Sequence, residues 1–424
     1  MEEGARGPRL RAAIRRVAID LAPLRASRDF RRIWFGLSVS QFGYQFTLVA
    51  SFIQVLDLTG SATAVGLIGL VGLVALVAGT LIGGAFVDVV DRRTTLIVAQ
   101  LGYMTASGVL LLGAIHGDPP LWVVYAAVAL IAGLSAIDSP VRSAMTPRLV
   151  GQDLLPGALT LYQVVFNAAA LIGPGLAGVV IARFDVAAAY GVDLVSYLAM
   201  LWAAIRIRPM PPERAPGAPT GWAAVREGFA YLRGRRVLQS TFVIDIVAMV
   251  FGNPRALFAI LAATQFHAGD TVTGLLFAAP AVGALVGALT MGWVQRVRHQ
   301  GRAVVWAVMA WGAGIAAFGL VGDRPPLALG LLAFAGAADV ISAVFRTTIL
   351  QLSVPDALRG RLSQIHILVV TGGPRLGDLE AGLVAGAFSP TVSVVSGGLL
   401  CIVGAGLVGW LVPSLWRYHA GESA

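Results

Sequence analysis

The sequence predicts an all-α membrane protein with twelve transmembrane helices arranged as two six-helix halves. Of its 424 residues, 57% are hydrophobic and 12% are charged, and the charged share is about half of that in a typical soluble domain. Apolar runs of about 20 residues recur along the chain, and each is long enough to cross a hydrocarbon core of roughly 30 Å. The 51 glycines suit helices that pack closely within a membrane.

The apolar runs set the order of the expected spans. A Pro-rich, polar stretch over 208–236 divides them into two groups of six, and we interpret it as a central cytoplasmic loop. The expected spans lie near 33–57, 62–86, 95–116, 121–145, 158–182, 187–207, 237–263, 272–294, 303–322, 327–351, 362–387 and 391–413.

These spans divide the chain into five regions. Residues 1–32 form an Arg-rich N-terminal segment, which is either an amphipathic helix on the membrane surface or a disordered basic tail. Residues 33–207 form the N-terminal bundle, residues 237–413 form the C-terminal bundle, and residues 414–424 form a tail.

The placement of arginine predicts the orientation. The chain has a net charge of +9 and contains no lysine. If the N-terminus is cytoplasmic, the only arginines outside the cytoplasmic segments are Arg183, Arg255, Arg324 and Arg375. Positive charge is typically retained on the cytoplasmic side. We therefore expect both termini to be cytoplasmic, and topology explains the basic charge better than a nucleic-acid partner does.

Nothing in the sequence points to catalysis. Cys401 is the single cysteine, the five histidines lack metal-ligand spacing, and a chain without lysine has no nucleotide-binding phosphate loop. We expect no enzyme activity, no metal and no cofactor.

The two halves resemble each other weakly. Arg142-x-x-x-x-Pro147-x-x-Val150 closes the fourth span, and Arg346-x-x-x-x-Gln351-x-x-Val354 closes the tenth. A chain of six plus six spans with paired halves is the plan of a rocking transporter whose site lies between the halves near mid-membrane.

The loop between spans 2 and 3 reads Gly84-x-x-x-Asp88-x-x-Asp91-Arg92-Arg93. This resembles the signature of the major facilitator superfamily, except that Asp91 replaces the usual glycine. The stretches 60–67 and 253–258 resemble the enterobactin-exporter and macrolide-efflux group within that superfamily. The resemblance implies twelve helices and an exporter of small molecules driven by the proton gradient.

The same resemblance implies a cytoplasmic gate. Asp88 would meet the start of span 11 near Arg361, and Arg92 would pair with Asp138. An alternative is that the loop only keeps its side of the chain in the cytoplasm. The residues assigned to this gate are Gly84, Asp88, Asp91, Arg92, Arg93, Asp138, Arg142, Arg346 and Arg361.

Charged residues inside the spans are the candidates for proton coupling, because each costs roughly 3 kcal/mol or more in a bilayer. In span 11, Arg375 lies three residues before Asp378 and is expected to pair with it. Glu380 faces elsewhere and is expected to pair with Arg255 of span 7. A static network that holds spans 7 and 11 together is the alternative.

Three further acids lie within spans. Asp245 in span 7 and Asp339 in span 10 are second candidates for proton coupling. Arg346 lies two turns after Asp339, too far for a simple pair along one helix. Asp193 in span 6 is expected to bond to a neighbouring helix.

Polar and aromatic side chains at helical spacing mark a possible substrate cavity. Helix-to-helix bonds, or for the aromatics a place in the core, are the alternatives. The candidates are Gln41, Tyr44, Gln45, Gln54, Gln163, Phe166, Asn167, Phe251 and Phe258.

Together these observations predict a monomeric, proton-coupled exporter in the cytoplasmic membrane of a bacterium. Its expected partners are protons, the lipid bilayer and an amphipathic small molecule, either a siderophore or a drug-like natural product. A membrane sensor or assembly protein on a degenerate transporter fold is the alternative outside transport. An importer or a gradient-independent uniporter is the alternative within it.

Overall fold

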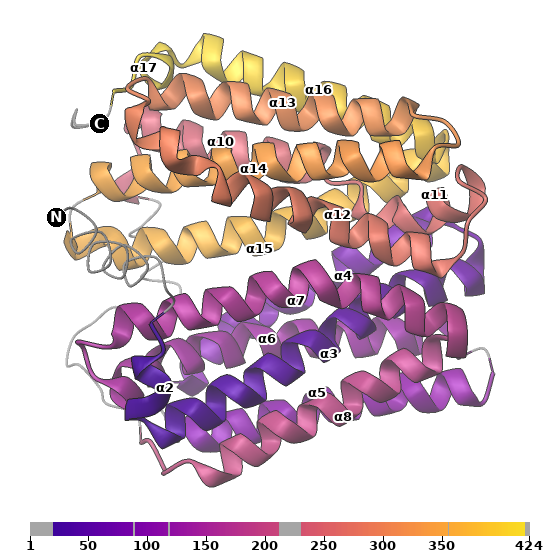
Figure 1. The fold of residues 1–424 in the computed structure, drawn as a ribbon, viewed down its shortest axis with the longest axis vertical. Helices are drawn as coiled ribbons and strands as arrows, with labels where there is room; N and C mark the ends of the chain where they lie inside the picture. Colours follow the sequence, from indigo (N-terminus) through magenta and orange to yellow (C-terminus); the bar gives the residue numbers. More distant parts are fainter. Residues whose placement is uncertain (1–19, 88–89, 118, 212–229, 355, 420–424) are drawn as a thin grey trace, which may run out of the picture.

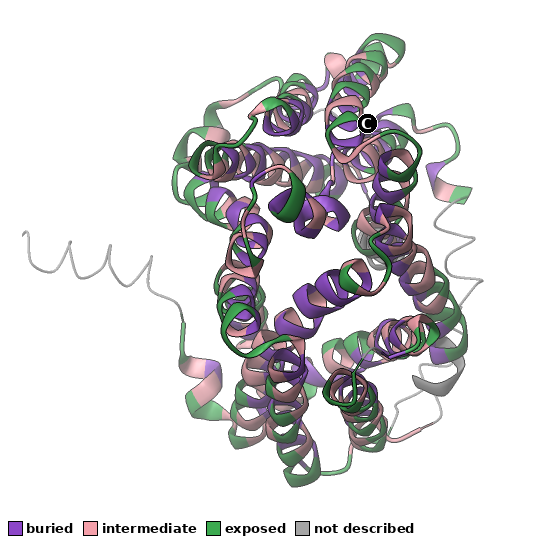
Figure 2. Ribbon diagram, turned by 90° about the vertical axis from the view of Figure 1, so that its right-hand side faces the viewer, coloured by how far each residue is buried: buried purple, intermediate pink, exposed green. Residues whose placement is uncertain are grey.

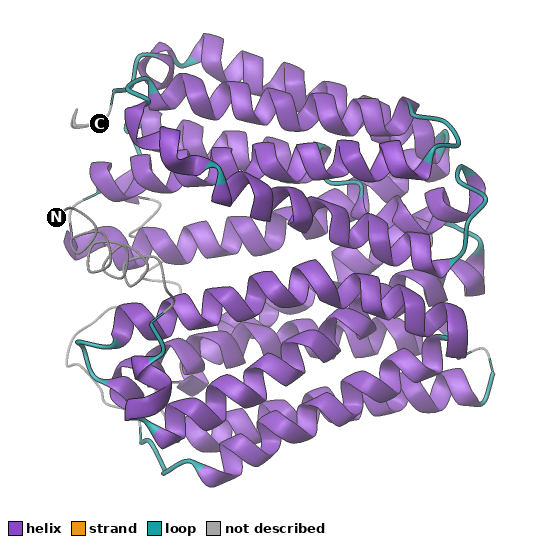
Figure 3. Ribbon diagram, viewed as in Figure 1, coloured by secondary structure: helices purple, strands orange, loops and turns teal. Residues whose placement is uncertain are grey.

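The computed structural model describes residues 20–87, 90–117, 119–211, 230–354 and 356–419, and these residues form helices and loops with no strand (Figure 3). Most of the N-terminal segment and the middle of the central loop lie outside them. The helices of the first half are α2 (Ala22–Ala26), α3 (Arg28–Thr59), α4 (Ala62–Val87), α5 (Arg92–Ile115), α6 (Leu121–Val150), α7 (Leu155–Phe184) and α8 (Val186–Arg206).

The second half follows the central loop and has a similar succession of long helices. Its elements are α10 (Arg236–Phe251), η2 (Arg255–Leu257), α11 (Phe258–Thr264), α12 (Asp270–Leu289), η3 (Met291–Arg296), α13 (Gln300–Leu320), α14 (Pro325–Ser353), α15 (Asp356–Ala387), α16 (Pro390–Leu411) and α17 (Pro413–Trp416).

Within the described residues, ten helical stretches are long and apolar enough to cross a membrane, with α10 to α11 counted as one. Two more helices of 32 residues each, α3 and α15, lie in the same bundle and are less apolar. Figure 2 shows exposed residues along the outer faces of the helices and buried residues between them. Many of the exposed residues are large and apolar, such as Trp410, which is 75% exposed, as expected of a surface that faces lipid.

Local sequence explains where several helices begin and end. Asp91 caps α5, because its carboxylate accepts a hydrogen bond of 3.1 Å from the Thr94 backbone N–H. Gly60 ends α3 at a φ of 59°, in the left-handed region. Span 7 is interrupted after Phe251, and Pro254 precedes the short helix η2. A proline removes a backbone donor from the helix, which accounts for the break.

The helices pack as two bundles that meet along two contacts. In the first bundle α3 packs on α7 and α8, and α6 packs on α4 and α5; in the second, α10 packs on α15 and α16, and α14 packs on α12 and α13. The bundles contact each other mainly where α4 meets α15 and where α7 meets α12. Both ends of the described chain lie on one side of the molecule, at the left in Figure 1, which we call the terminal side; the other is the far side.

Candidate functional site between the two bundles

The break in span 7 places Arg255 against α15. The Arg255 Nε donates to Asp378 Oδ1 at 3.1 Å, and Nη2 donates to Asp378 Oδ2 at 2.5 Å. Asp378 is 1% exposed, so this two-pronged pair is buried, and charge-assisted bonds of this geometry are strong. The expected pairs Arg255–Glu380 and Arg375–Asp378 are therefore wrong. The interruption of span 7 at 252–254 sets the direction and level at which Arg255 reaches α15.

Arg255 also connects the two bundles. Its guanidinium carbon lies 5.9 Å from the centre of the Phe52 ring on α3, within the range of a cation–π contact. Phe52 packs on aromatic rings of the second bundle. Its ring centre is 5.6 Å from the ring centre of Phe277, and the ring centres of Phe277 and Phe258 are 5.1 Å apart. This row packs the cation against apolar rings. Phe52 was not identified from the sequence, because pairing across the bundles depends on tertiary packing.

Arg375 adds a second cation beside the pair. It interacts electrostatically with Arg255, with Asp378 and with Tyr44 of α3. A Cβ added at Gly72 of α4 would overlap its guanidinium, so the absence of a side chain at Gly72 makes room for it. Among the described residues, no hydrogen bond or ion pair holds the Arg375 guanidinium. We call Arg255, Arg375 and Asp378 the two-arginine cluster.

A second charged cluster lies within the C-terminal bundle. Arg346 of α14 forms an ion pair with Asp245 of α10, and its Nη2 lies 3.7 Å from Asp339 Oδ1. Arg346 is 5% exposed. We call these three residues the two-aspartate cluster. The expectation that Arg346 is too far from Asp339 is wrong, because the long arginine side chain extends back along α14. The assignment of Arg346 to the cytoplasmic gate stays a prediction.

Glu380 belongs to neither cluster. It is partly buried on α15, and the described part of the chain holds no ion pair or hydrogen bond from its carboxylate.

The arginines of the loop between α4 and α5 bind within their own bundle. Arg92 Nη1 donates to the Ala144 carbonyl of α6 at 3.1 Å, and Arg93 Nη2 donates to the Ile205 carbonyl of α8 at 2.7 Å. Asp138 pairs instead with Arg142, one turn later on α6. The predicted Arg92–Asp138 pair is not formed in this conformation, in which Arg92 and Arg93 bind backbone carbonyls and Asp138 binds Arg142.

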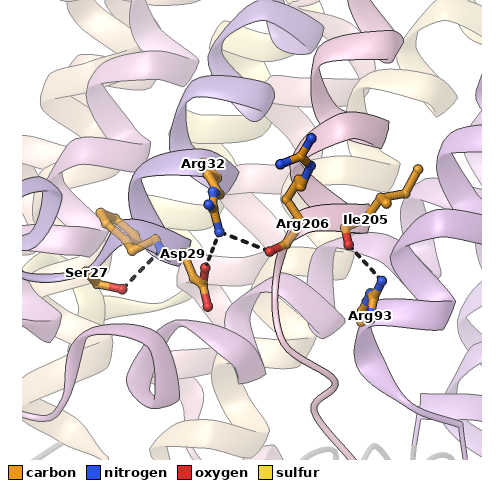
Figure 4. A network of polar contacts seen from close by, with 7 residues as sticks. Ser27, Asp29, Arg32, Arg93, Ile205 and Arg206 are labelled. Atoms are coloured by element: carbon orange, nitrogen blue, oxygen red, sulfur yellow. Dashed lines mark hydrogen bonds and ion pairs between the residues drawn. The ribbon is translucent and has the colours of Figure 1, made fainter.

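The close-up in Figure 4 places Arg93 beside a similar contact from α3. Arg32 Nη1 donates to Asp29 at 2.9 Å and to the Arg206 carbonyl at 3.0 Å. Together these bonds tie the end of α8 to α3 and α5. Gly84 lies in α4, while Asp88 and the side chain of Arg361 lie outside what the structure describes, so their proposed contact stays a prediction.

Asp193 bonds to neighbouring helices, which confirms that expectation. Its Oδ2 accepts hydrogen bonds from Thr47 of α3 at 2.6 Å and from Ser107 of α5 at 2.7 Å. Asp193 is 0% exposed. The two hydroxyl donors were not identified from the sequence, where isolated serine and threonine residues are common in apolar spans.

The cavity candidates divide into several environments. Gln54 is buried, and its amide oxygen accepts a hydrogen bond of 2.7 Å from the Tyr190 hydroxyl, so it joins helix to helix. Phe258 is 3% exposed and belongs to the core. Phe251 packs on the core of the second bundle. These three placements favour the alternatives to cavity lining.

The other candidates are more accessible. Gln163 and Asn167 are exposed on α7 and bond to each other at 3.1 Å, and Phe166 between them is 41% exposed. Gln41, Tyr44 and Gln45 are partly buried on α3. Among these described side chains, Tyr44 interacts electrostatically with both Arg255 and Arg375.

Glycines bring the bundles together on the far side. A Cβ at Gly66 of α4 would lie 2.8 Å from the Gly382 Cα of α15, and one at Gly178 of α7 would lie 2.9 Å from the Gly274 Cα of α12. Small residues allow helix backbones to approach this closely. Both contacts lie toward the ends of their helices that are remote from the termini (Figure 1).

One hollow in the described structure involves neither charged cluster. It is a groove of about 920 Å³ between α3 and α8, lined by apolar side chains that include Val39, Phe42 and Val195.

Comparison with known proteins places this geometry in context. The family model described as "Transmembrane secretion effector", of the major facilitator superfamily, matches residues 18–415. The enterobactin exporter EntS of Citrobacter koseri is 25% identical over 95% of this chain and 96% of its own length. EntS of Shigella boydii serotype 18 is 25% identical over 91% of this chain and 92% of its own length.

Solved structures share the fold. A bacterial homologue of the iron transporter ferroportin, in an inward-facing state, has a TM-score of 0.68 at 15% identity and covers 92% of this chain and 98% of its own. The D323A mutant of the nucleoside transporter NupG has a TM-score of 0.70 at 11% identity, over 92% of this chain and 100% of its own. At these identities the likeness concerns the fold alone.

Proposed function

The chain belongs to the transmembrane secretion effector family of the major facilitator superfamily, and from this premise we propose that it exports an amphipathic small molecule in exchange for protons. Alternating access moves the substrate across the cytoplasmic membrane of a bacterium. All twelve long helices cross the bilayer, α3 and α15 included. Both termini are cytoplasmic.

The positions of the arginines support this orientation. Arg32, Arg92 and Arg93 all bind carbonyls or carboxylates at the terminal side. Arginine is retained on the cytoplasmic side of bacterial membranes, so the terminal side is cytoplasmic. The far side, where the glycine contacts lie, is then extracytoplasmic.

The glycine contacts also support a direction of closure. Gly66 against Gly382 and Gly178 against Gly274 hold the bundles together on the extracytoplasmic side. In this conformation the substrate enters from the cytoplasm. Release outside requires the bundles to part there, which separates Phe52 of one bundle from Arg255 of the other.

One observation carries the proposal of proton coupling: in the two-aspartate cluster, a single guanidinium serves two carboxylates. Arg346 contacts both Asp245 and Asp339. One cation neutralises one carboxylate, and a second buried negative charge is costly unless it is paired. A proton on Asp339, whose side chain is 33% exposed and therefore the more accessible acid, removes that charge.

Export of an amphipath is supported by the relatives and by the aromatic surroundings of Arg255. The curated relatives are exporters of enterobactin. A membrane sensor has no need of transport, and a uniporter works without a gradient. Both alternatives are decided by one assay.

The assay measures transport in reconstituted vesicles with an imposed pH gradient, with enterobactin and a panel of macrolide antibiotics as probes. The proposal expects accumulation of a probe that collapses when an ionophore removes the gradient. Equilibration of a probe without accumulation, at the same rate with and without the ionophore, would indicate a uniporter. No transport of any probe, from protein that binds one of them, would favour a sensor.

A further inference from the structure

We infer that the Arg375 guanidinium binds an anionic group of the transported substrate, so that this protein selects amphipathic anions; the inference rests on the proposed function. The starting point is the charge of the two-arginine cluster. Arg255 and Asp378 satisfy each other through two hydrogen bonds. The pair is neutral, and the positive charge of Arg375 is left over.

Other charged groups near Arg375 do not compensate for it. The groups that interact with it electrostatically are Tyr44, Arg255 and Asp378. The packed helix α4 carries no charged residue between Ala62 and Val87. An arginine in the middle of a transmembrane helix is costly, so an unpaired one here indicates a function more readily than a role in stability.

The position of Arg375 suits a ligand held between the bundles. Arg375 lies on α15, which faces α4 of the other bundle, and its guanidinium packs over Gly72 of that helix. Tyr44 of α3 lies within electrostatic range of Arg375. A ligand at this point touches both bundles, as alternating access requires.

The surroundings also specify the rest of the ligand. Phe52 lies against Arg255, and its ring continues into Phe277. An anion bound at Arg375 therefore has aromatic surface nearby for an apolar body. A carboxylate or an ionised phenol fits best, because a guanidinium donates two parallel hydrogen bonds to such oxygens.

The two clusters then divide the work of exchange. The two-arginine cluster has one positive charge in excess and attracts the anion, whereas the two-aspartate cluster has one negative charge in excess and attracts the proton. Substrate and proton thus have separate binding places in the same bundle, which allows each to be removed by mutation without the other.

The test uses two fluorescent probes that differ only in charge, 1-pyrenebutanoate and the neutral 1-pyrenebutanamide. Their binding to the purified protein in nanodiscs is followed by energy transfer from tryptophan. We expect the wild-type protein to bind the anion at least tenfold more tightly than the amide. The Arg375→Gln variant should lose this preference, Arg375→Lys should retain much of it, and Arg324→Gln, an arginine in a far-side loop, should match the wild type.

Equal affinity of the wild-type protein for the two probes would overturn the inference, as would an unchanged preference in Arg375→Gln. Thermal unfolding of each variant separates loss of binding from loss of fold, and rescue by Arg375→Lys excludes a purely structural effect. The vesicle assay for proton-driven export does not depend on this preference. A wild-type protein that exports with the gradient but ignores probe charge refutes only the inference, and one that prefers the anion without gradient-driven export refutes only the proposed function.

Discussion

Arg255 of the interrupted seventh span donates two hydrogen bonds, of 3.1 and 2.5 Å, to Asp378 of α15 at the place where the bundles meet. The pair is the main polar link between η2 and α15, and it lies beside a cation, Arg375, that has no such partner in the described chain.

Replacing one partner of the Arg255–Asp378 pair should lower the free energy of unfolding more, per substitution, than replacing both partners together. Asp378→Asn or Arg255→Gln leaves one buried group without its partner and should lower the free energy of unfolding by about 3 kcal/mol. In the double variant Arg255→Met/Asp378→Leu, the free energy of unfolding should fall by less than the sum of the two single-variant losses. Chemical unfolding in detergent measures the cycle, and additive losses would contradict the coupling. Asp29→Asn, at a partly exposed pair with Arg32, is the control and should lose less than about 1 kcal/mol.

Closure on the far side should depend on Gly69. A Cβ there would lie 2.7 Å from the Asp378 Cβ, so Gly69→Val should push α4 away from α15. The readout is a cysteine pair, Thr63→Cys with Gly386→Cys, whose positions are in contact. It is placed in a Cys401→Ser background, because Cys401 is the only native cysteine.

Oxidation should cross-link this pair in the parent, and Gly69→Val should reduce the yield severalfold. Gly330→Val is the matched control, since nothing lies within 4 Å of an added Cβ at Gly330. Equal yields in all three proteins would show that the glycine contact does not govern closure.

Two histidines at the terminal side should respond to pH. His299 Nε2 lies 3.1 Å from His419 Nε2. Reduced hydration, then His419 and the Arg302 guanidinium, lower the pKa of His299 below its usual 6.5. A base with a lowered pKa binds its proton more weakly in the folded contact, so the contact is kept at neutral pH and is lost progressively as the pH falls below the usual pKa of 6.5.

The nearby Trp416, which packs on Trp306 at 6.4 Å, supplies the signal. Its fluorescence should shift between pH 8 and pH 5 in the wild-type protein and stay constant in His299→Gln. A shift of the same size in that variant would assign the response to another group.

A structural feature could be predicted from the sequence where residues of a single helix are enough to cause it. The break at Asn253–Pro254 follows from proline geometry, and the need of Asp193 for neighbours follows from its burial in an apolar span. The order and limits of the long helices also follow from the apolar runs, because length and hydrophobicity decide them.

Pairings between helices were not predictable in the same way. Arg255 meets Asp378 rather than Glu380 because the break in span 7 sets its level on α15. Arg92 finds the Ala144 carbonyl rather than Asp138 because Arg142, on the same helix, already holds that carboxylate. Arg346 reaches both aspartates because its side chain is long and flexible. Helix register, helix ends and the length of the side chains decide these contacts, and residue spacing in the sequence does not determine any of the three.

The most direct test of the account is the proton flux that accompanies export, recorded with a pH-sensitive dye inside vesicles during transport of enterobactin. The wild-type protein should move protons only when enterobactin moves. Asp339→Asn, in the two-aspartate cluster, should reduce that proton flux at least tenfold. The variant should still exchange enterobactin when its concentration is equal on the two sides of the membrane. Asp29→Asn should behave as the wild type does. A proton flux that persists unchanged in both Asp339→Asn and Asp245→Asn would contradict the assignment of proton coupling to this cluster.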